Sequence, residues 1–397
     1  MYKIRRVQHF CEWCFAHLCK SIRRRFLVLL CSICAFLLLL RWKLMCINMQ
    51  PRMHIQNICL GYGSGHSVGS LCQDMCEPEG ISSVSCHSFY MEKDTVFSGT
   101  WKNQSLVFKT VKETSNSPWE SNISENEFLH VVQSNIKLKF NISVDIVDAK
   151  RMSYIQYNQK EISRQVEMQN AWSLLQNNEY LALSLYEKYG IFPRLVGSCG
   201  SMYAVQKLDS ISGYWHLMTI YDSQEEWERR IKIALMILDF LSLLEQRLPE
   251  PLHLCDIKMN NFGVTNDFKK VMYLDLDSVH PQSVINKITA DGSKCKKHSD
   301  CDFLDCRSFC NLITYKCQHG VVNNNLQMVC ERIFLGWVMS GRVMVPGLLL
   351  GPRTPRVLTE LLEMCANPAN EAGTPRARAN KEIRRRLYSL LTHMILS

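Results

Sequence analysis

The sequence has no apolar run of the usual membrane-spanning length. Its longest uncharged apolar run, Phe26 to Leu40, has 15 residues. As a helix it would cover about 22 Å of a hydrocarbon core that is about 30 Å thick. A second apolar stretch, residues 333–351, contains Arg342, so it is not predicted to span a membrane. The chain therefore has at most one transmembrane segment.

The chain also lacks a nucleic-acid-binding module, although its formal net charge is +9. The basic residues concentrate in the first 43 residues and in the tail from Arg353, with no aromatic-interleaved basic run between them. We therefore attribute the basic residues near the N-terminus to the orientation of a membrane segment, and those near the C-terminus to a basic tail. No nucleic-acid partner is expected. The composition, 47% hydrophobic and 21% charged, excludes a disordered or fibrous chain.

Basic residues flank the short apolar run and predict its orientation. Arginines 23–25 precede it, and Arg41 and Lys43 follow it. This pattern favours a cytosolic stub over residues 1–25 and a signal-anchor transmembrane helix over residues 26–47, lengthened by apolar residues after the run. A cleaved signal peptide is the alternative, but no small-x-small site follows the run.

Three glycosylation sequons lie beyond the apolar run, at Asn103, Asn122 and Asn141. Thirteen of the 19 cysteines lie beyond residue 50, in clusters that suit an oxidising compartment. Whether the apolar run is a signal anchor or a cleaved signal peptide, the chain from about residue 50 would lie in the secretory lumen. We therefore expect a glycoprotein of the secretory pathway with disulfide bonds.

Thirteen of the 19 cysteines fall into three groups. The stub has Cys11, Cys14, His17 and Cys19, but it has no core to fix zinc ligands, so acylation or no role at all is favoured. Residues 50–92 are rich in glycine and serine and predict a small module held by two disulfides of unknown pairing among Cys59, Cys72, Cys76 and Cys86. The cluster over residues 295–330 has no C-x-x-C pair, which favours three disulfides over zinc. Its members are Cys295, Cys301, Cys306, Cys310, Cys317 and Cys330.

The middle of the chain shows the pattern of a mixed α and β protein. Residues 95–109 predict a β-hairpin that turns at residues 101–104 and ends at Lys109. Residues 112–165 are polar and weakly periodic, which predicts an exposed insertion. Apolar periodicity then predicts a helix over residues 170–190 that ends at Gly190.

A strand pair, a long helix and a polar loop follow. The helix begins at a capping box formed by Ser223 and Glu226. Its apolar stripe consists of Trp227, Ile231, Leu235, Leu238 and Leu241. The loop lies in the stretch LHLCDIKMNNFGV, residues 252–264, and a short strand ending in carboxylates follows in KKVMYLDLDSV. The end of the chain is predicted to be helical.

This order of parts resembles that of a protein kinase. Lys109 takes the place of the lysine that holds the α- and β-phosphates, and Glu179 that of its ion-pair partner. Asp256 would orient the acceptor hydroxyl and accept its proton, with Lys258 beside the γ-phosphate. Asn261, five residues beyond Asp256, and Asp275, fourteen beyond Asn261, would hold magnesium or manganese through oxygen ligands.

Four departures from the kinase pattern are visible. The hairpin has only Gly99 where a kinase has a glycine-rich loop, with Trp101 and Lys102 at its tip. Leu254 and Cys255 replace the usual His and Arg before the catalytic aspartate, so control by activation-loop phosphorylation is not expected. Leu276 and Asp277 replace the Phe and Gly that usually follow the metal-binding aspartate, and the A-P-E segment is missing.

The chain resembles the divergent protein kinase domain 1 family, cysteine-rich type II membrane proteins of the endoplasmic reticulum (ER). The stretches AWSLLQNNEYLAL, PRLVGSCGSMY, LCDIKMNNFGV and CKKHSDCDFLDCRSFCNLITYKC carry the resemblance. It implies an α+β, protein-kinase-like two-lobed fold with a disulfide-rich N-terminal module and a single N-terminal transmembrane helix. The N-lobe would cover residues 93–210, with the insertion, and the C-lobe residues 211–397, with the cysteine cluster.

The resemblance also implies a disulfide between Cys199 and Cys255, for which two buried free thiols are the alternative. Some family members carry a calcium-binding EF-hand-like insertion, but residues 144–165 contain no D-x-D-x-D-G run, so no such site is predicted. The first functional hypothesis is an ER-anchored, lumen-facing kinase that uses ATP and Mg²⁺ or Mn²⁺ on secretory-pathway proteins. A pseudokinase scaffold is the second, and a cysteine-rich membrane adaptor is the third.

Overall fold

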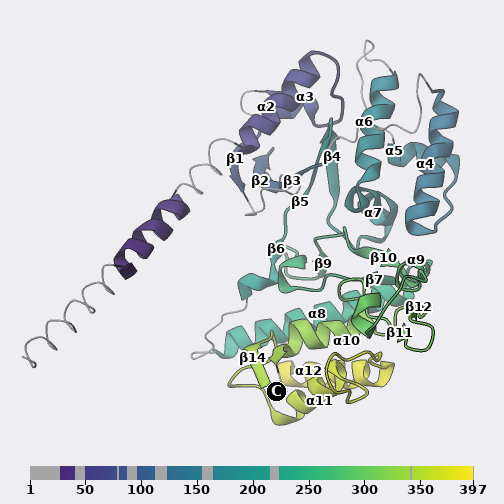
Figure 1. Ribbon diagram of the computed structural model, residues 1–397. Coiled ribbons are helices and arrows are strands. Elements are labelled where there is room, and N and C mark those ends of the chain that lie inside the picture. Colours follow the sequence, from purple (N-terminus) through teal and green to yellow (C-terminus); the bar gives the residue numbers. More distant parts are fainter. Residues whose placement is uncertain are drawn as a thin grey trace, which may run out of the picture.

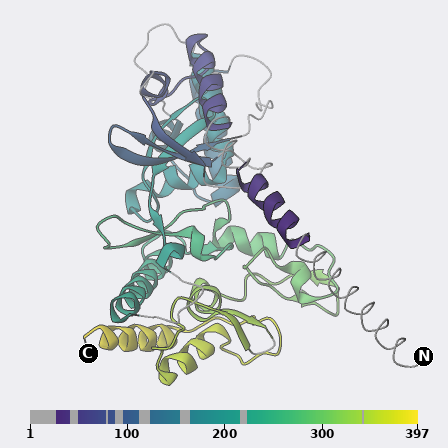
Figure 2. The ribbon, with the colours of Figure 1, turned by 90° about the vertical axis from the view of Figure 1, so that its left-hand side faces the viewer.

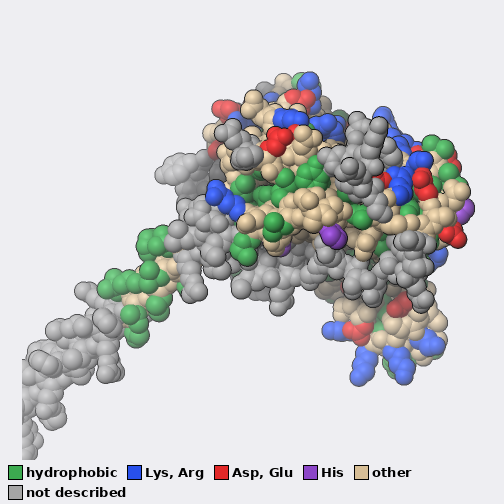
Figure 3. Space-filling model, turned by 90° about the horizontal axis from the view of Figure 1, so that it is seen from above, with side chains coloured by type: hydrophobic (Ala, Val, Ile, Leu, Met, Phe, Trp, Pro, Cys, Tyr) green, Lys and Arg blue, Asp and Glu red, His purple; other side chains and the backbone are tan. Residues whose placement is uncertain are grey.

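The computed structural model describes residues 27–40, 50–77, 80–86, 96–111, 123–153, 164–214, 223–339 and 342–396. Residues 27–40 form a helix whose apolar side chains are exposed, as the green side chains of Figure 3 show. Among the described helices, none combines the length and apolarity that a bilayer crossing requires. The stub cysteines and Asn122 lie outside the described ranges, as does part of the predicted anchor over residues 26–47, which stays a prediction.

A five-stranded sheet forms the upper part of the molecule (Figure 1). Every neighbouring pair in it is antiparallel. The strand order is β1(Ser82–Cys86), β2(Val96–Trp101), β3(Gln104–Thr110), β5(Met202–Gln206) and β4(Leu195–Cys199). The predicted hairpin is therefore confirmed as β2 and β3, and its turn places Lys102 and Asn103 at positive φ.

The two faces of this sheet pack against different partners, because side chains alternate along each strand. Leu106 and Phe108 of β3 belong to a small core shared with the N-terminal module. Val107 packs against the main core of the protein, and so does Tyr203 of β5. Lys109, between Phe108 and Thr110, therefore points to the face that the helices cover.

The N-terminal module consists of α2(Gln50–Gly63), α3(Cys72–Cys76) and β1. Cys59 bonds to Cys76 inside the module, whereas Cys72 bonds to Cys199 at the end of β4. The module is therefore covalently joined to the sheet across 127 residues of sequence. The disulfide predicted between Cys199 and Cys255 is wrong, because Cys199 lies on the sheet face that α3 covers.

Gly69 shows how closely the module fits the sheet. Its φ is +154°, and a Cβ there would lie 2.1 Å from the carbonyl oxygen of Ser198. We expect Gly69→Ala to lower the free energy of unfolding by about 2 kcal/mol, measured by thermal and denaturant unfolding of the full chain. Gly63→Ala is the matched control, because a Cβ at Gly63 meets nothing within 4 Å. Equal stabilities of the two variants would contradict close packing of the module.

The segment predicted as an exposed insertion contains two packed helices, so that prediction is wrong for residues 125–153. They are α4(Glu125–Phe140), which begins at a capping box of Ser124 and Glu127, and α5(Ile146–Ser153). The buried side chains of α4 include Phe128, Val132, Ile136 and Phe140. Their spacing of four residues places them on one face of the helix, where they join the main core.

The predicted helix over residues 170–190 is two helices. They are α6(Arg164–Gln176) and α7(Asn178–Tyr186), and the short 3-10 helix η1(Glu187–Tyr189) follows. The break occurs at Asn177, whose side chain accepts a hydrogen bond from the Tyr180 amide and caps α7. Gly190 ends the segment, as predicted, with φ +59°.

The lower part of the molecule is built on α8(Gln224–Gln246) (Figure 2), and its predicted capping box of Ser223 and Glu226 is confirmed. The strand β7(Leu252–Leu254) pairs with β10(Val279–Pro281), and β8(Phe262–Val264) lies between β6(Asp209–Ser210) and β9(Val271–Tyr273). Two short 3-10 helices lie between these strands in sequence: η2(Ile211–Tyr214) follows β6, and η4(Met259–Asn261) precedes β8.

The C-terminal part adds helices, short strands and a π-helix. In order they are α9(Gln282–Thr289), η5(His298–Cys301), β11(Cys310–Asn311), β12(Lys316–Cys317), α10(Asn325–Val329), the π-helix η6(Cys330–Leu335), β13(Gly336–Met339), β14(Arg342–Pro346), α11(Arg356–Ala366) and α12(Lys381–Leu396). The apolar stretch over residues 333–351 thus enters η6 and the β13–β14 hairpin.

The cysteine cluster over residues 295–330 forms two internal disulfides and not the predicted three. These are Cys295–Cys310 and Cys301–Cys317. Cys306 instead bonds to Cys255, and Cys330 bonds to Cys365, which the sequence analysis did not select. The outward bonds form because Cys306 lies against the loop after β7, and Cys330 begins η6, which packs on α11.

Candidate functional site

Lys109 and Glu179 form a buried ion pair between β3 and α7. Their side chains are 15% and 6% exposed. Lys109 Nζ also donates to the carbonyl oxygen of Leu274, at 3.4 Å. The pair therefore links the sheet, the helix and the segment that follows β9, as expected from their positions in the sequence.

Neighbouring carboxylates shift the pKa values of this pair. Burial acts to lower the pKa of Lys109, but the negative charges of Glu179, Asp275 and Asp277 outweigh it and raise the pKa above its ordinary value. Burial raises the pKa of Glu179 to about 7 against the opposing effect of Lys109, and Asp277 and Asp275 add to the rise. The three carboxylates of Glu179, Asp275 and Asp277 thus act on Lys109 together, so their negative charge exceeds the positive charge of this lysine.

Carboxylate oxygens of Glu179, Asp275 and Asp277 lie within 4.8 Å of one another. Asp275 was predicted as a metal ligand, whereas Asp277 was not. An all-oxygen donor set of this kind fits Mg²⁺ or Mn²⁺. The excess negative charge and the donor chemistry thus agree with a divalent cation at this place.

The sulfur atoms of Cys295, Cys301 and Cys310 also lie within 4.8 Å of one another. All three cysteines are bonded in disulfides, so they offer no thiolate to a metal. This agrees with the interpretation of the cluster as disulfides rather than a zinc site.

Asp256, Lys258 and Asn261 meet in the loop between β7 and β8. Lys258 Nζ lies 2.7 Å from Asp256 Oδ2. Asn261 Nδ2 donates to the Asp256 carbonyl oxygen at 2.9 Å, and Tyr273 OH donates to the same oxygen. Within the described part of the chain no hydrogen bond engages Asn261 Oδ1, so this oxygen is free to face a cation, which fits the predicted role of Asn261.

Two further contacts hold this loop in place. The side chain of Asn325, at the start of α10, accepts from the Leu254 amide at 2.9 Å and donates to the Leu252 carbonyl at 2.8 Å. The amide of Leu274 donates to the Asn261 carbonyl at 2.7 Å. The second contact connects the loop of Asp256 directly to the segment that carries Asp275.

The tip of the β2–β3 hairpin differs from a glycine-rich loop. Lys102 Nζ lies 2.8 Å from Asp74 Oδ2 and 4.7 Å from the centre of the Trp101 ring. A Cβ at Gly99 would lie 2.8 Å from the Ile81 side chain. The hairpin is therefore packed against the N-terminal module.

A groove of about 1480 Å³ opens beside the loop of Asp256. Lys258 and Met259 line one end of it, and Arg332 of η6, Glu363 of α11 and Arg386 of α12 line other parts. Charges of both signs therefore face the groove, which extends from the loop to the C-terminal helices.

The predicted modification sites differ in their surroundings. Asn103 is exposed at the hairpin turn. Asn141 is the C-cap of α4, and its Nδ2, the atom that would carry a glycan, donates to Ser283 Oγ at 2.9 Å. Cys86 is the last residue of β1. The other three cysteines of its predicted group are bonded without it, so the prediction of two disulfides within the module is wrong: one forms there, and Cys72 bonds to Cys199 instead.

Sequence reasoning missed Asp277, Tyr273, Asn325 and Asp305. Asp277 had a visible signal, a second carboxylate two residues after Asp275. The other three act through contacts with the loop main chain from positions 17, 71 and 48 residues away in sequence. No local pattern marks such contacts.

Two family models match the chain. The model described as "N-term cysteine-rich ER, FAM69" matches residues 14–151, and the one described as "Protein-kinase domain of FAM69" matches residues 171–368. Among solved structures, the crystal structure of the BubR1 kinase domain is similar over 80% of this chain and 83% of that chain, with a TM-score of 0.36 and 10% identity. A structural similarity this low carries no argument.

The two family matches confirm the family that the sequence stretches predicted, and with it the kinase-like α+β fold. One match covers the region of the N-terminal disulfides, and the other covers the helix of Glu179, the loop of Asp256 and the aspartates after β9. The chain therefore belongs to the FAM69 family, whose two matching models are described as a cysteine-rich ER region and a protein-kinase domain.

Proposed function

We propose that this chain is an active protein kinase that uses ATP and Mg²⁺ or Mn²⁺ to phosphorylate hydroxyl groups of secretory-pathway proteins. The observation that carries the proposal is the buried Lys109–Glu179 pair beside Asp275. The loop of Asp256 is hydrogen-bonded to the same segment. A kinase needs these groups together, because it acts mainly by positioning and by neutralising charge on the transferred phosphoryl group.

Each residue has a distinct task in this proposal. Lys109 binds the α- and β-phosphates, and Glu179 holds the lysine in place. Asp275 and Asn261 are the metal ligands, with Asp277 as an additional oxygen donor, and the bound cation would neutralise phosphate charge. Asp256 orients the acceptor hydroxyl and receives its proton, while Lys258 stabilises the charge on the phosphoryl group.

The proposed location is the ER membrane, with a single N-terminal span, a cytosolic N-terminus and the bulk of the chain in the lumen. The six disulfides described support an oxidising compartment. The basic residues before the apolar run support the orientation. Lumenal substrates would reach Asp256 through the groove lined by Lys258, Met259 and Arg332.

A pseudokinase scaffold is the second candidate, and the hairpin tip favours it. Lys102 is held at the tip by Asp74, where a glycine-rich loop would bring backbone amides over the phosphates. In this alternative the chain binds nucleotide or a lumenal protein without transferring phosphate.

Nucleotide binding and turnover can be separated in one set of measurements. We expect ATP with Mn²⁺ to raise the melting temperature of the purified full chain, because the ligand binds only the folded state. Asp275→Asn is expected to abolish the shift, because it removes one carboxylate ligand. Phosphate transfer by the wild type supports the kinase, and a shift without transfer supports the pseudokinase. The absence of any shift in the wild type would contradict the kinase and a nucleotide-binding pseudokinase, and it would leave only a scaffold that binds a lumenal protein.

A further inference from the structure

Asp305 and Cys306 are bonded to the residues on both sides of Asp256. Cys306 is bonded to Cys255, the residue before Asp256, and the Asp305 amide donates to the Cys255 carbonyl at 2.9 Å. On the other side, Asp305 Oδ2 accepts from the amide of Ile257 at 2.8 Å. We call Asp305 and Cys306 the loop clamp.

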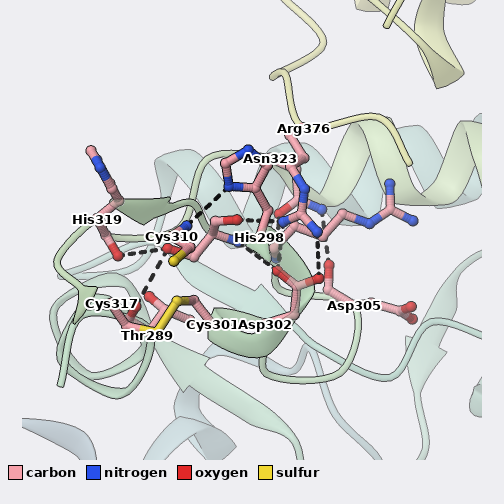
Figure 4. Close-up of polar contacts among 12 residues, drawn as sticks. Thr289, His298, Cys301, Asp302, Asp305, Cys310, Cys317, His319, Asn323 and Arg376 are labelled. Atoms are coloured by element: carbon pink, nitrogen blue, oxygen red, sulfur yellow. Dashed lines mark hydrogen bonds and ion pairs between the residues drawn. A yellow bond between two sulfur atoms is a disulfide. The ribbon is translucent and has the colours of Figure 1, made fainter. Parts of the chain in front are cut away.

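The loop clamp is itself held by buried polar contacts. Asn323 donates to the Asp305 carbonyl at 2.9 Å (Figure 4). It also accepts from the Arg307 amide at 2.9 Å. Arg307 forms two hydrogen bonds of 2.7 Å with the Glu331 carboxylate. Arg332 lies 3.3 Å from Asp305 Oδ1, so the second carboxylate oxygen is also engaged.

Hydrogen bonds of Asp302 fix the segment next to the loop clamp. Arg376 donates to both oxygens of Asp302, at 2.6 and 2.8 Å (Figure 4). Asp302 also accepts from the Ser308 amide at 2.9 Å. The Arg376 and Asp302 side chains are 7% and 15% exposed. The segment on both sides of Asp305 is therefore fixed to the C-terminal part of the chain.

We propose that Asp305 is a positioning residue for Asp256. It touches neither the acceptor nor the phosphates, and it acts by fixing the amide that follows Asp256 and the carbonyl that precedes it. The usual His and Arg are missing before Asp256, so the clamp supplies support from a segment about fifty residues further along. This inference rests on the proposed function, because Asp256 needs an exact position only if it acts on an acceptor.

The kinetic test uses hydrolysis of ATP with Mn²⁺ by the full chain, with water as the acceptor. Water attacks the γ-phosphorus, the bond to the bridging oxygen breaks, and ADP and phosphate are released. We expect Asp305→Ala to lower kcat by about 10- to 100-fold, because a small displacement of a reacting group is costly. The KM for ATP should change less than about twofold, because Lys109, Glu179 and Asp275 lie on other segments.

A second readout does not depend on phosphate transfer. Hydrogen exchange of the peptide over residues 252–264 should accelerate by about tenfold in Asp305→Ala, because the Ile257 amide loses its acceptor. If the wild type does not hydrolyse ATP and this acceleration is still observed, the proposed kinase function is contradicted. The result would still support the role of Asp305 in fixing the loop of Asp256. Unchanged exchange would overturn the clamp whatever the activity.

Two variants separate positioning from general damage. Asp305→Asn keeps an oxygen acceptor for the Ile257 amide, so it should restore most of kcat and of the exchange protection. Asp300→Ala is the matched control, because Asp300 also accepts from main-chain amides, those of Lys296 and Lys297 at 2.8 and 3.1 Å, in the same cluster. It should leave the loop of Asp256 unchanged, and a loss of kcat equal to that of Asp305→Ala would overturn the proposal.

Should Asp305→Ala fail to fold, Arg332→Met provides the test. Arg332 is 46% exposed and contacts Asp305 from the groove side. Its loss should raise exchange at residues 252–264 and lower kcat with little change in the KM for ATP. Wild-type exchange at residues 252–264 together with wild-type kcat in Arg332→Met would overturn the role of the Asp305 carboxylate.

Discussion

Lys109→Met is expected to lower phosphate release from ATP by at least about 100-fold, because it removes the cation that holds the nucleotide phosphates. The side chain is 15% exposed and paired with Glu179, so another lysine cannot take its place without rearrangement. The measurement is single-turnover and steady-state hydrolysis of ATP with saturating Mn²⁺ by the purified full chain.

Lys232→Met is the matched control, because Lys232 is exposed on α8. It removes the same charge and leaves the Lys109–Glu179 pair intact, so activity should remain at the wild-type value. Retention of more than about a tenth of the activity in Lys109→Met would contradict the assigned role of this lysine.

The same variant should also be less stable, and this effect can be separated from catalysis. Removing Lys109 leaves Glu179 buried beside Asp275 and Asp277 without a counter-charge, which costs about 3 kcal/mol. Lys109→Met combined with Glu179→Leu removes the whole pair, so it should regain most of the lost stability and none of the activity. If the double variant recovered activity, the pair would have no role in transfer.

The site residues were accessible to sequence reasoning because their signals are local. Asp256, Lys258 and Asn261 lie within six residues of one another. Lys109 lies in a predictable strand, and Asp275 follows another. The structure brings these residues together through β3, the loop after β7 and the segment after β9. Asp277 could have been added on the same grounds, since it lies beside Asp275 in the sequence.

The prediction of an exposed insertion was wrong for residues 125–153 for a different reason. The four-residue spacing from Phe128 to Phe140 is a helical signal, but polar residues and two nearby sequons led to the interpretation of an exposed insertion. The apolar face is narrow, since the intervening residues are mostly polar, and it is buried only because α6 and the main core cover it. The burial of this segment therefore depends on tertiary packing, which its composition does not reveal.

The disulfide partners could not be predicted from spacing. Cysteine clusters favour pairing with near neighbours, and Cys295–Cys310 and Cys301–Cys317 follow that expectation. Cys72 and Cys306 each bond outside their cluster, because the fold places a strand end or a loop against them. These two long-range bonds attach the cysteine-rich parts to the β-sheet and to the loop of Asp256.

The bond between Cys72 and Cys199 should contribute more stability than any bond confined to one cluster. It closes a loop of 127 residues, whereas Cys59–Cys76 closes one of 17. In the chain-entropy description these loops correspond to about 5 and about 3 kcal/mol. We therefore expect Cys72→Ala with Cys199→Ala to lower the melting temperature of the full chain more than Cys59→Ala with Cys76→Ala does.

The two double variants are a matched pair, because both remove one disulfide from the same module. Only the first detaches the module from β4, so only it should expose residues 50–77 to limited proteolysis under non-reducing conditions. Since Lys102 at the hairpin tip is held by Asp74 of this module, detachment should also free the tip and change the KM for ATP. Equal melting temperatures and equal proteolysis in the two variants would contradict an anchoring role for Cys199, because the strand pairing of β1 with β2 would then hold the module alone.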